Sequence, residues 1–210
     1  MSNLANTTVS SHDRILRSAK HLFAEMGYEN TSTVSIARDA GTSESQLMKH
    51  FGSKQGLLVA IFDRGWNRVV ERVKATNHSA SPADRVVAML TAATIELEND
   101  PQFKILAALE ARRIGKDSSD VVVSSGYRRY RELLDRALID MRTEGQIRSD
   151  LNLDAVRAAV IGMADGLWRD QIFATRGGMA SSYSLDDIQQ VIELLVNSFH
   201  EPAAQRAKAS

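Results

Sequence analysis

Apolar residues recur at helical spacing along most of this chain. Residues 11–27 show the pattern most clearly, because their apolar positions fall on one face of a helix. Those positions are Ile15, Leu16, Ala19, Leu22, Phe23 and Met26. The same spacing returns in six later segments, at 54–76, 82–99, 101–115, 119–144, 154–175 and 185–200. The three prolines, at 82, 101 and 202, lie at the edges of these segments, so the pattern predicts an all-α fold.

One segment also fits a strand. The opening of the 119–144 segment, SDVVVSS, is rich in β-branched residues, but the sequence offers it no evident partner strand.

Residues 33–51, TVSIARDAGTSESQLMKHF, contain two shorter helical patterns joined by a turn. We expect helices over about 33–40 and 44–50, with Gly41 in the left-handed conformation that ends the first. Two short helices joined by a tight glycine turn form a helix-turn-helix, whose second helix can enter the major groove of DNA.

The local chemistry supports this interpretation. Ser32 or Thr33 can cap the first helix, and Ser43 can cap the second. With Leu47 and Phe51 directed inward, the second helix presents a mostly polar outer or edge face. That face comprises Glu44, Ser45, Gln46, Met48, Lys49 and His50. Donors and acceptors of this size can read base edges and contact phosphates.

Composition narrows the kind of nucleic-acid binding. The 210 residues are 43% hydrophobic and 25% charged, as in ordinary globular proteins, and 26 Lys+Arg balance 26 Asp+Glu. A net charge of zero argues against a protein that coats nucleic acid through a broad basic surface. Even residues 1–55 hold only six Lys/Arg against five Asp/Glu. Affinity for DNA therefore has to come from placement and dimerisation.

Other compartments and chemistries find little support in the sequence. The absence of cysteine excludes disulfides, thiol chemistry and cysteine-ligated zinc. The N-terminus MSNLANTTVSSHD does not have the pattern of a signal peptide, and no apolar run is long enough to cross a bilayer. We expect a cytoplasmic protein that does not interact with membranes.

Three motifs together resemble the TetR family of bacterial transcriptional regulators. They are R-I-L-x-x-A-x-x-L-F-A-E-x-G-Y at 14–28, T-S-x-x-x-I-A-x-x-A-G at 31–41, and S-x-x-x-L-x-K-H-F-x-S-K-x-x-L-L at 43–58. The resemblance covers about the first 60 residues; beyond residue 75 only the helical layout and the length match. It implies a three-helix helix-turn-helix domain at 11–55 and a C-terminal domain of about six helices at 56–201. Flexible tails at 1–10 and 202–210 would flank these two domains.

The resemblance also implies a function. Regulators of this family are homodimers, usually repressors, whose N-terminal helices bind a palindromic operator in double-stranded DNA. A small effector, bound by the C-terminal helices, releases that DNA. Two positions depart from the family pattern, because Met48 replaces a phosphate-bonding tyrosine and Thr42 replaces a typical valine. Met48 leaves an alternative open, a helical ligand- or protein-binding module with weakened DNA binding.

The family motifs transfer a DNA-contacting role to specific positions. Gln46 could pair bidentately with adenine, and Lys49 could reach guanine or phosphate. The resemblance assigns contacts with the DNA backbone to His50 and Lys54. It assigns phosphate contacts to Ser32 and Thr33, at the start of the helix predicted at 33–40. The candidate set is Ser32, Thr33, Ser43, Ser45, Gln46, Met48, Lys49, His50 and Lys54.

Gly162 and Gly166 lie four residues apart within one helical segment. Each costs a helix about 1 kcal/mol relative to alanine, so the pair suggests a close approach of another helix. Because the family dimerises through its last two helices, the candidate dimer contact is Ala159, Gly162, Gly166, Val191, Leu195 and Phe199. Packing within one subunit is the alternative for the two glycines.

An effector pocket is a further expectation from the family layout. Aromatic and methionine side chains line apolar pockets, although at helical spacing they also form ordinary core. The candidates are Phe62, Trp66, Met89, Phe103, Glu110, Tyr127, Tyr130, Met163 and Trp168. Glu110 and Asp165 could receive a polar ligand group or be satisfied by the protein itself.

Catalysis finds no motif in this sequence. The five histidines are scattered without metal-ligand spacing, and the chain has neither a glycine-rich phosphate loop nor a nucleophile motif. Asp186 and Asp187 suit the N-terminus of a helix rather than a metal site. We therefore expect no enzyme activity, no metal and no cofactor.

Overall fold

The computed structural model describes residues 10–75, 80–110, 123–178 and 183–199, and within them every regular element is an α-helix. The all-α prediction is therefore confirmed. The N-terminal helices are α1 (Ser11–Met26), α2 (Thr33–Asp39), α3 (Glu44–Phe51) and α4 (Lys54–Ala75). The C-terminal helices are α5 (Pro82–Asn99), α6 (Pro101–Glu110), α7 (Ser125–Thr143), α8 (Leu153–Gly177) and α9 (Leu185–Asn197).

Helix ends follow local capping chemistry. Ser10 caps α1, Ser81 caps α5 with Pro82 in the first turn, and Ser184 forms a capping box with Asp187. Asp186 and Asp187 lie in the first turn of α9, as predicted, and hydrogen bonds from Ser184 lower the pKa of the Asp187 carboxyl. The predicted stretch between α6 and α7, with its strand alternative, lies largely at 111–122, outside the described residues. The predicted tails also lie outside them, except for Ser10.

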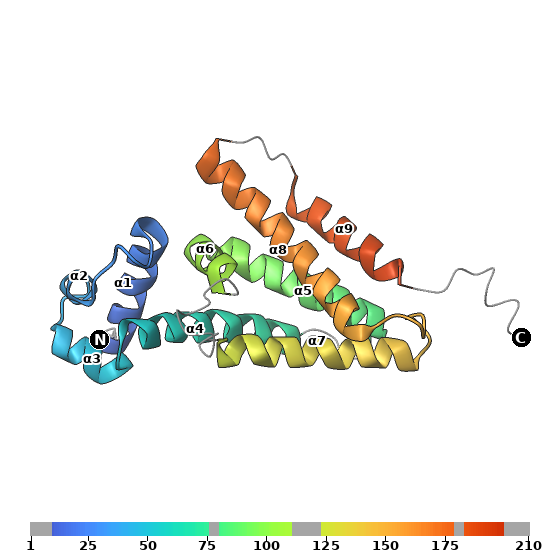
Figure 1. The fold of residues 1–210 in the computed structure, drawn as a ribbon, viewed down its shortest axis with the longest axis horizontal. Helices are drawn as coiled ribbons and strands as arrows, with labels where there is room; N and C mark the ends of the chain where they lie inside the picture. The colour runs from blue at the N-terminus through green and yellow to red at the C-terminus, as the bar shows by residue number, and fades with distance from the viewer. Residues whose placement is uncertain (1–9, 76–79, 111–122, 179–182, 200–210) are drawn as a thin grey trace, which may run out of the picture.

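Helices α1, α2 and α3 pack around a small core of their own. Ile15, Phe23, Ile36 and Leu47 are almost completely buried there, so each helix contributes at least one anchor. These three helices lie together at one end of the molecule, next to the start of α4 (Figure 1).

Helix α4 belongs to both parts of the structure. Its first turns pack on α1 and α3, and its later turns pack on α5, α6 and α7. Buried positions recur at helical spacing along its length: Leu57, Leu58, Ile61, Phe62, Gly65, Trp66, Val69, Val70 and Val73. One apolar face therefore runs continuously from the helix-turn-helix into the C-terminal helices.

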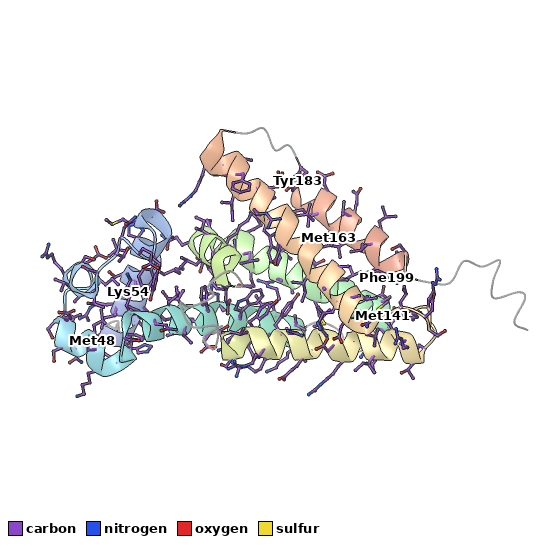
Figure 2. All side chains as sticks on the ribbon, in the orientation of Figure 1. Met48, Lys54, Met141, Met163, Tyr183 and Phe199 are labelled. Carbon is purple, nitrogen blue, oxygen red and sulfur yellow. The ribbon has the colours of Figure 1, made fainter. Side chains whose placement is uncertain are left out.

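The C-terminal helices form a bundle around α5. Helix α7 packs against both α4 and α5, while α8 and α9 pair with each other and cover α5 (Figure 1). Figure 2 shows Met48 and Lys54 at the helix-turn-helix end, and Met163 and Phe199 at α8 and α9.

Two glycines allow aromatic side chains to approach the backbone closely. A Cβ at Gly65 would lie 2.2 Å from the ring of Phe103, and a Cβ at Gly126 would lie 2.8 Å from the Cβ of Trp66. Phe103 is 1% exposed, so its ring has no free space into which it could retreat. The contact between α4 and α6 therefore depends on the absence of a side chain at Gly65.

Replacing Gly65 with alanine tests this contact. We expect Gly65→Ala to lower the free energy of unfolding by about 1–3 kcal/mol, because the new methyl overpacks a filled site. Phe103→Leu shortens the opposing side chain, so the double variant should lose less stability than the sum of the two single losses. Urea unfolding followed by circular dichroism measures all three. Strictly additive losses would show that the two residues do not share this contact.

Candidate nucleic-acid interface

The starts of α2 and α3 are defined by serine caps. Ser32 is the cap of α2: its Oγ accepts from the Ser35 backbone N–H at 3.1 Å, and the Ser35 Oγ accepts from the Ser32 N–H at 3.2 Å. Thr33 is the first helical residue, and its hydroxyl donates to Glu44 of α3. Ser43 caps α3 by accepting from the Gln46 N–H at 3.1 Å. The N-termini of both helices are thus tied to each other.

The turn between the two helices has the geometry that its glycine permits. Gly41 has φ +62°, in the left-handed region that side chains disfavour, as predicted. The Thr42 N–H then donates to the Ala37 carbonyl at 2.9 Å, which closes the end of α2. Leu47, with no exposed surface, anchors α3 from below. These contacts fix the orientation of α3, the second helix of the helix-turn-helix, which we call the recognition helix.

The outer face of α3 is exposed as the pattern predicts. Glu44, Ser45, Lys49 and His50 are exposed, and Gln46 is half-buried. Met48 is 41% exposed on the same helix (Figure 2), so a thioether stands on the surface where a hydroxyl would bond phosphate in the family.

Residues at the start of α1 contact the outer face of α3. The sequence did not predict these contacts. The Nε2 atom of His50 lies 3.1 Å from the Ser11 Oγ and 3.2 Å from the Gln46 Nε2. His12 meets the His50 ring edge-on at 5.6 Å and stacks on Phe51 at 4.8 Å. The polar residues in the first turn of α1 could have indicated a contact of this kind, but the sequence does not show that Ser11 meets His50, which lies 39 residues away.

Lys54 is held at the first turn of α4. Its ammonium lies 4.3 Å from the ring centroid of Tyr28 and donates to the Glu29 carbonyl at 3.4 Å. A cation held over an aromatic face is preorganised relative to a freely rotating lysine. The loop between α1 and α2 therefore positions the one basic side chain that opens α4.

Four of the proposed pocket aromatics form a cluster inside the C-terminal part. The Trp66 ring lies 5.9 Å from Phe103, 5.0 Å from Tyr127 and 5.3 Å from Tyr130, measured between centroids. Glu110 joins this cluster, because its Oε2 accepts from the Trp66 Nε1–H at 2.7 Å.

The other pocket candidates surround the cluster or lie apart from it. Phe62 and Met89 are buried, and the Tyr130 hydroxyl lies 3.4 Å from the Met89 carbonyl. Trp168 is buried and donates to Thr94 at 3.4 Å, while Met163 is partly buried on α8.

Burial dominates the electrostatics of the aromatic cluster. It raises the pKa of Glu110 above the ordinary value of 4.5, although hydrogen bonds from Ser124 and Trp66 act in the opposite direction. Burial also raises the pKa of Tyr130 and of Tyr127, and the negative charge of Asp165 acts in the same direction on both. Both hydroxyls therefore stay neutral at physiological pH.

The outer sides of α8 and α9 carry the proposed dimer residues. Ala159 and Gly162 are exposed, and a Cβ built at Gly162 or Gly166 meets nothing within 4 Å in the described structure. Val191 is 42% exposed, while Leu195 and Phe199 are half-buried. Leu194 is 73% exposed and was not among the predicted dimer residues. The adjacent pair Leu194-Leu195 nevertheless places apolar residues on two sides of α9.

No group of three or more His, Asp or Glu side chains in the described residues could hold a metal ion. No described helix is long and apolar enough to cross a membrane.

An exposed, capped recognition helix on a helix-turn-helix, followed by a helical C-terminal domain, defines a DNA-binding transcriptional regulator. The family model for bacterial regulatory proteins of the tetR family matches residues 15–61, which span the helix-turn-helix and the start of α4. The N-terminal part of the chain, over these residues, is therefore that of a tetR-family regulator.

Known proteins resemble the chain over most of its length. The fatty acid metabolism regulator protein of Bacillus subtilis (strain 168) is 23% identical over 189 residues, covering 89% of this chain and 94% of the relative. The fatty acid degradation regulator FadR of Bacillus halodurans has a TM-score of 0.76 at 19% identity, covering 90% of this chain and 96% of that one. FadR from Bacillus subtilis, in complex with stearoyl-CoA, has a TM-score of 0.74 at 20% identity and covers 90% and 98%.

The raised pKa of Glu110 has a measurable consequence. Because the native state holds this proton more tightly than the unfolded chain, the associated stability is present below pH 4.5 and is lost as the pH rises through the native pKa. Relative to Glu110→Gln, which does not titrate, the wild type should therefore become progressively less stable above pH 4.5.

Urea unfolding of the two proteins at a series of pH values from about 4 to 8 measures this difference. A stability difference that stays constant, or that moves in favour of the wild type with rising pH, would contradict the assignment.

Proposed function

We propose that the chain is a homodimeric repressor that leaves a palindromic operator when a small effector binds. It acts by binding rather than by catalysis, in the cytoplasm, where the chromosome is accessible. In this proposal residues 11–55 form the DNA-binding domain and residues 56–201 form the effector-binding and dimerisation domain.

The observation that carries the proposal is the outer face of α3. Ser43 and Leu47 fix this helix from its end and from beneath, so Gln46 and Lys49 project from a rigid support. A glutamine amide matches the paired donor and acceptor of adenine, and a lysine reaches guanine or phosphate. The N-termini of α2 and α3 add backbone N–H groups that favour phosphates.

Neutral charge makes dimerisation necessary. With 26 basic against 26 acidic side chains, one copy has no broad electrostatic attraction for DNA. Two copies related by a two-fold axis would place their recognition helices in successive major grooves, one helical turn or a multiple apart. Sequence specificity then comes from two correctly spaced contacts.

The proposed dimer surface is the apolar outer side of α8 and α9. Leu194 and Val191 on α9 are exposed, and Ala159 and Gly162 on α8 leave room for a neighbouring backbone. An exposed leucine and an exposed valine beside small residues favour burial against a second copy, and an isologous contact of this kind is self-complementary.

The proposed effector site is the aromatic cluster around Trp66. Phe103, Tyr127 and Tyr130 offer apolar and aromatic surface, and Glu110 offers a carboxyl group within it. A ligand with an apolar portion would have to separate these side chains. Because Trp66 lies on α4, this separation would move the helix that begins at Lys54, beside the recognition helix. The effector would then favour a state with a different spacing of the two recognition helices.

Two substitutions separate base reading from phosphate contact. Gln46→Ala should reduce discrimination between operator and random DNA by about 1–3 kcal/mol, because it removes a base contact. Lys54→Ala should weaken binding to every sequence and reduce the slope of log affinity against log salt by about one unit.

Fluorescence anisotropy with the DNA flanking the chain's own gene, and with scrambled DNA of the same length, measures both effects. Equal losses on the two DNAs for both variants would refute this division of roles.

The dimer surface has its own test. Leu194→Glu should shift the protein to monomers and weaken operator binding, because a buried unpaired carboxylate opposes association. Ile139→Glu is the matched control, since Ile139 is 53% exposed on α7, outside the proposed surface, and should leave the dimer intact. Sedimentation velocity reads the oligomeric state. If Leu194→Glu remains as dimeric as Ile139→Glu, the interface lies elsewhere.

A further inference from the structure

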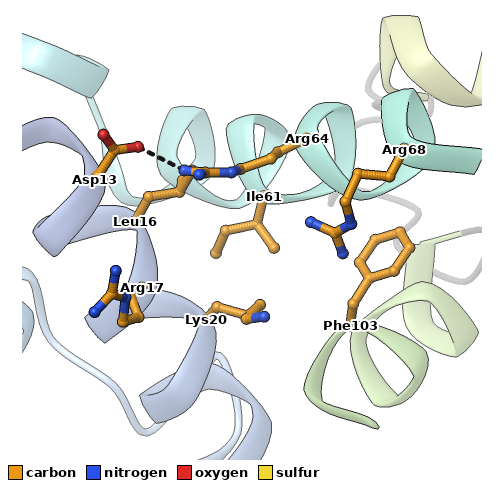
Figure 3. A pocket seen from close by; sticks show the side chains of 8 residues that line it. All are labelled: Asp13, Leu16, Arg17, Lys20, Ile61, Arg64, Arg68 and Phe103. Carbon is orange, nitrogen blue, oxygen red and sulfur yellow. Dashed lines mark hydrogen bonds and ion pairs between the residues drawn. The ribbon is translucent and has the colours of Figure 1, made fainter. Parts of the chain in front are cut away.

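A basic cleft lies between α1, α4 and α6, where the helix-turn-helix meets the C-terminal helices (Figure 3). Its cavity has a volume of about 170 Å³. One water occupies about 30 Å³ in the liquid, so the cleft has room for a phosphate-sized group and a few waters. It is separate from the recognition face and from the interior of the aromatic cluster, although Phe103 borders both cleft and cluster.

Helical spacing brings four cations to this cleft. Arg17 and Lys20 are three residues apart on α1, and Arg64 and Arg68 are four residues apart on α4, so each pair shares one face of its helix. Figure 3 shows Arg17 and Lys20 on α1 and Arg64 and Arg68 on α4, with the apolar side chain of Ile61 between the two helices and that of Phe103 beside Arg68. Apolar walls weaken solvent screening of any charge that enters.

Carboxylates neutralise only part of this charge. Asp13 pairs with Arg64 at 2.7 Å, and Asp100 pairs with Lys20 at 2.6 Å and with Arg68 at 2.7 Å. Four cations against these two carboxylates leave an excess of two positive charges. Glu96 also approaches Arg68, at 3.6 Å, but it pairs more closely with Arg72 at 2.6 Å, so these two residues cancel.

Arg17 is the unsatisfied member of the set. It is exposed and has neither a hydrogen bond nor an ion pair within the described part of the chain. Its planar guanidinium offers five N–H donors in a geometry that matches oxyanions. Because Arg64 and Lys20 already hold their positions through Asp13 and Asp100, the surrounding site is preorganised.

We propose that this cleft binds a phosphate-type oxyanion between Arg17 and Lys20 of α1 and Arg64 and Arg68 of α4. The anion is either free phosphate or the phosphate group of a larger metabolite. Because the bound anion contacts helices from both parts of the molecule, its occupancy restrains α1 relative to α4. The cleft is distinct from the effector site proposed above and shares only Phe103 with it.

Calorimetric titration of the full chain without DNA tests the site, with inorganic phosphate in one experiment and adenosine monophosphate in another. Chloride keeps the ionic strength constant throughout. Saturable binding of either probe is expected; tighter binding of the nucleotide would identify a larger ligand, and tighter binding of inorganic phosphate would identify the free anion.

Arg17→Gln removes one charged donor without breaking a bond in the described structure, so the fold should persist. It should weaken the binding of the preferred probe about tenfold or more, and Arg17→Lys should restore part of the affinity. Arg136→Gln is the control, because it removes an exposed arginine from α7, away from the cleft.

Three results would overturn the proposal. They are the absence of saturable binding to the wild type, unchanged affinity in Arg17→Gln, and an equal loss in Arg136→Gln. The last would indicate that bulk charge, rather than the cleft, attracts the anion. Operator binding plays no part in this experiment, so its outcome is distinguishable from a failure of the proposed function.

Discussion

Helix α4 carries one buried apolar face from Leu57, beneath the recognition helix, to Val73 in the C-terminal bundle. A close-packed interior transmits displacement because it has no free volume in which to absorb it. Trp66 contacts Phe103, Tyr127 and Tyr130, and it lies on α4, the same helix that positions Lys54. Reading DNA and sensing a ligand can be coupled in this fold because both depend on where one helix lies.

Hydrogen bonds and ion pairs also hold α1 against α4 and the C-terminal helices. Asp13 is bound to Arg64 of α4, Lys20 is bound to Asp100 at the start of α6, and Arg176 of α8 donates to the Ala24 carbonyl. Burial alone would raise the pKa of Asp100, but hydrogen bonds from Lys20 and the Phe103 N–H and the charge of Arg68 hold it below its ordinary value. The helix-turn-helix is thus fixed by apolar packing on one side and by charge on the other. Charged contacts respond to ions and pH, so this side is the more adjustable one.

Local features were readable from the sequence, and contacts between distant segments were not. Most helix bounds followed from periodicity and from polar residues such as Ser43 and Asp187, which act within three residues, but α7 begins at Ser125 rather than at the predicted residue 119. The left-handed turn at Gly41 is equally local. The contact of His12 with His50, the approach of Phe103 to Gly65 and the basic cleft all join residues that are neighbours only after folding. For the DNA face, the pattern predicted which side chains of α3 point outward, but which base each one reads depends on a DNA partner.

Selection of bound fragments from a random double-stranded DNA pool, followed by sequencing, tests the central claim most directly. A dimer whose recognition helices are positioned by α4 should enrich palindromic sites with half-sites centred about 10 base pairs, or a multiple of one helical turn, apart. Enrichment of single, unpaired half-sites, or no enrichment over the starting pool, would contradict the account.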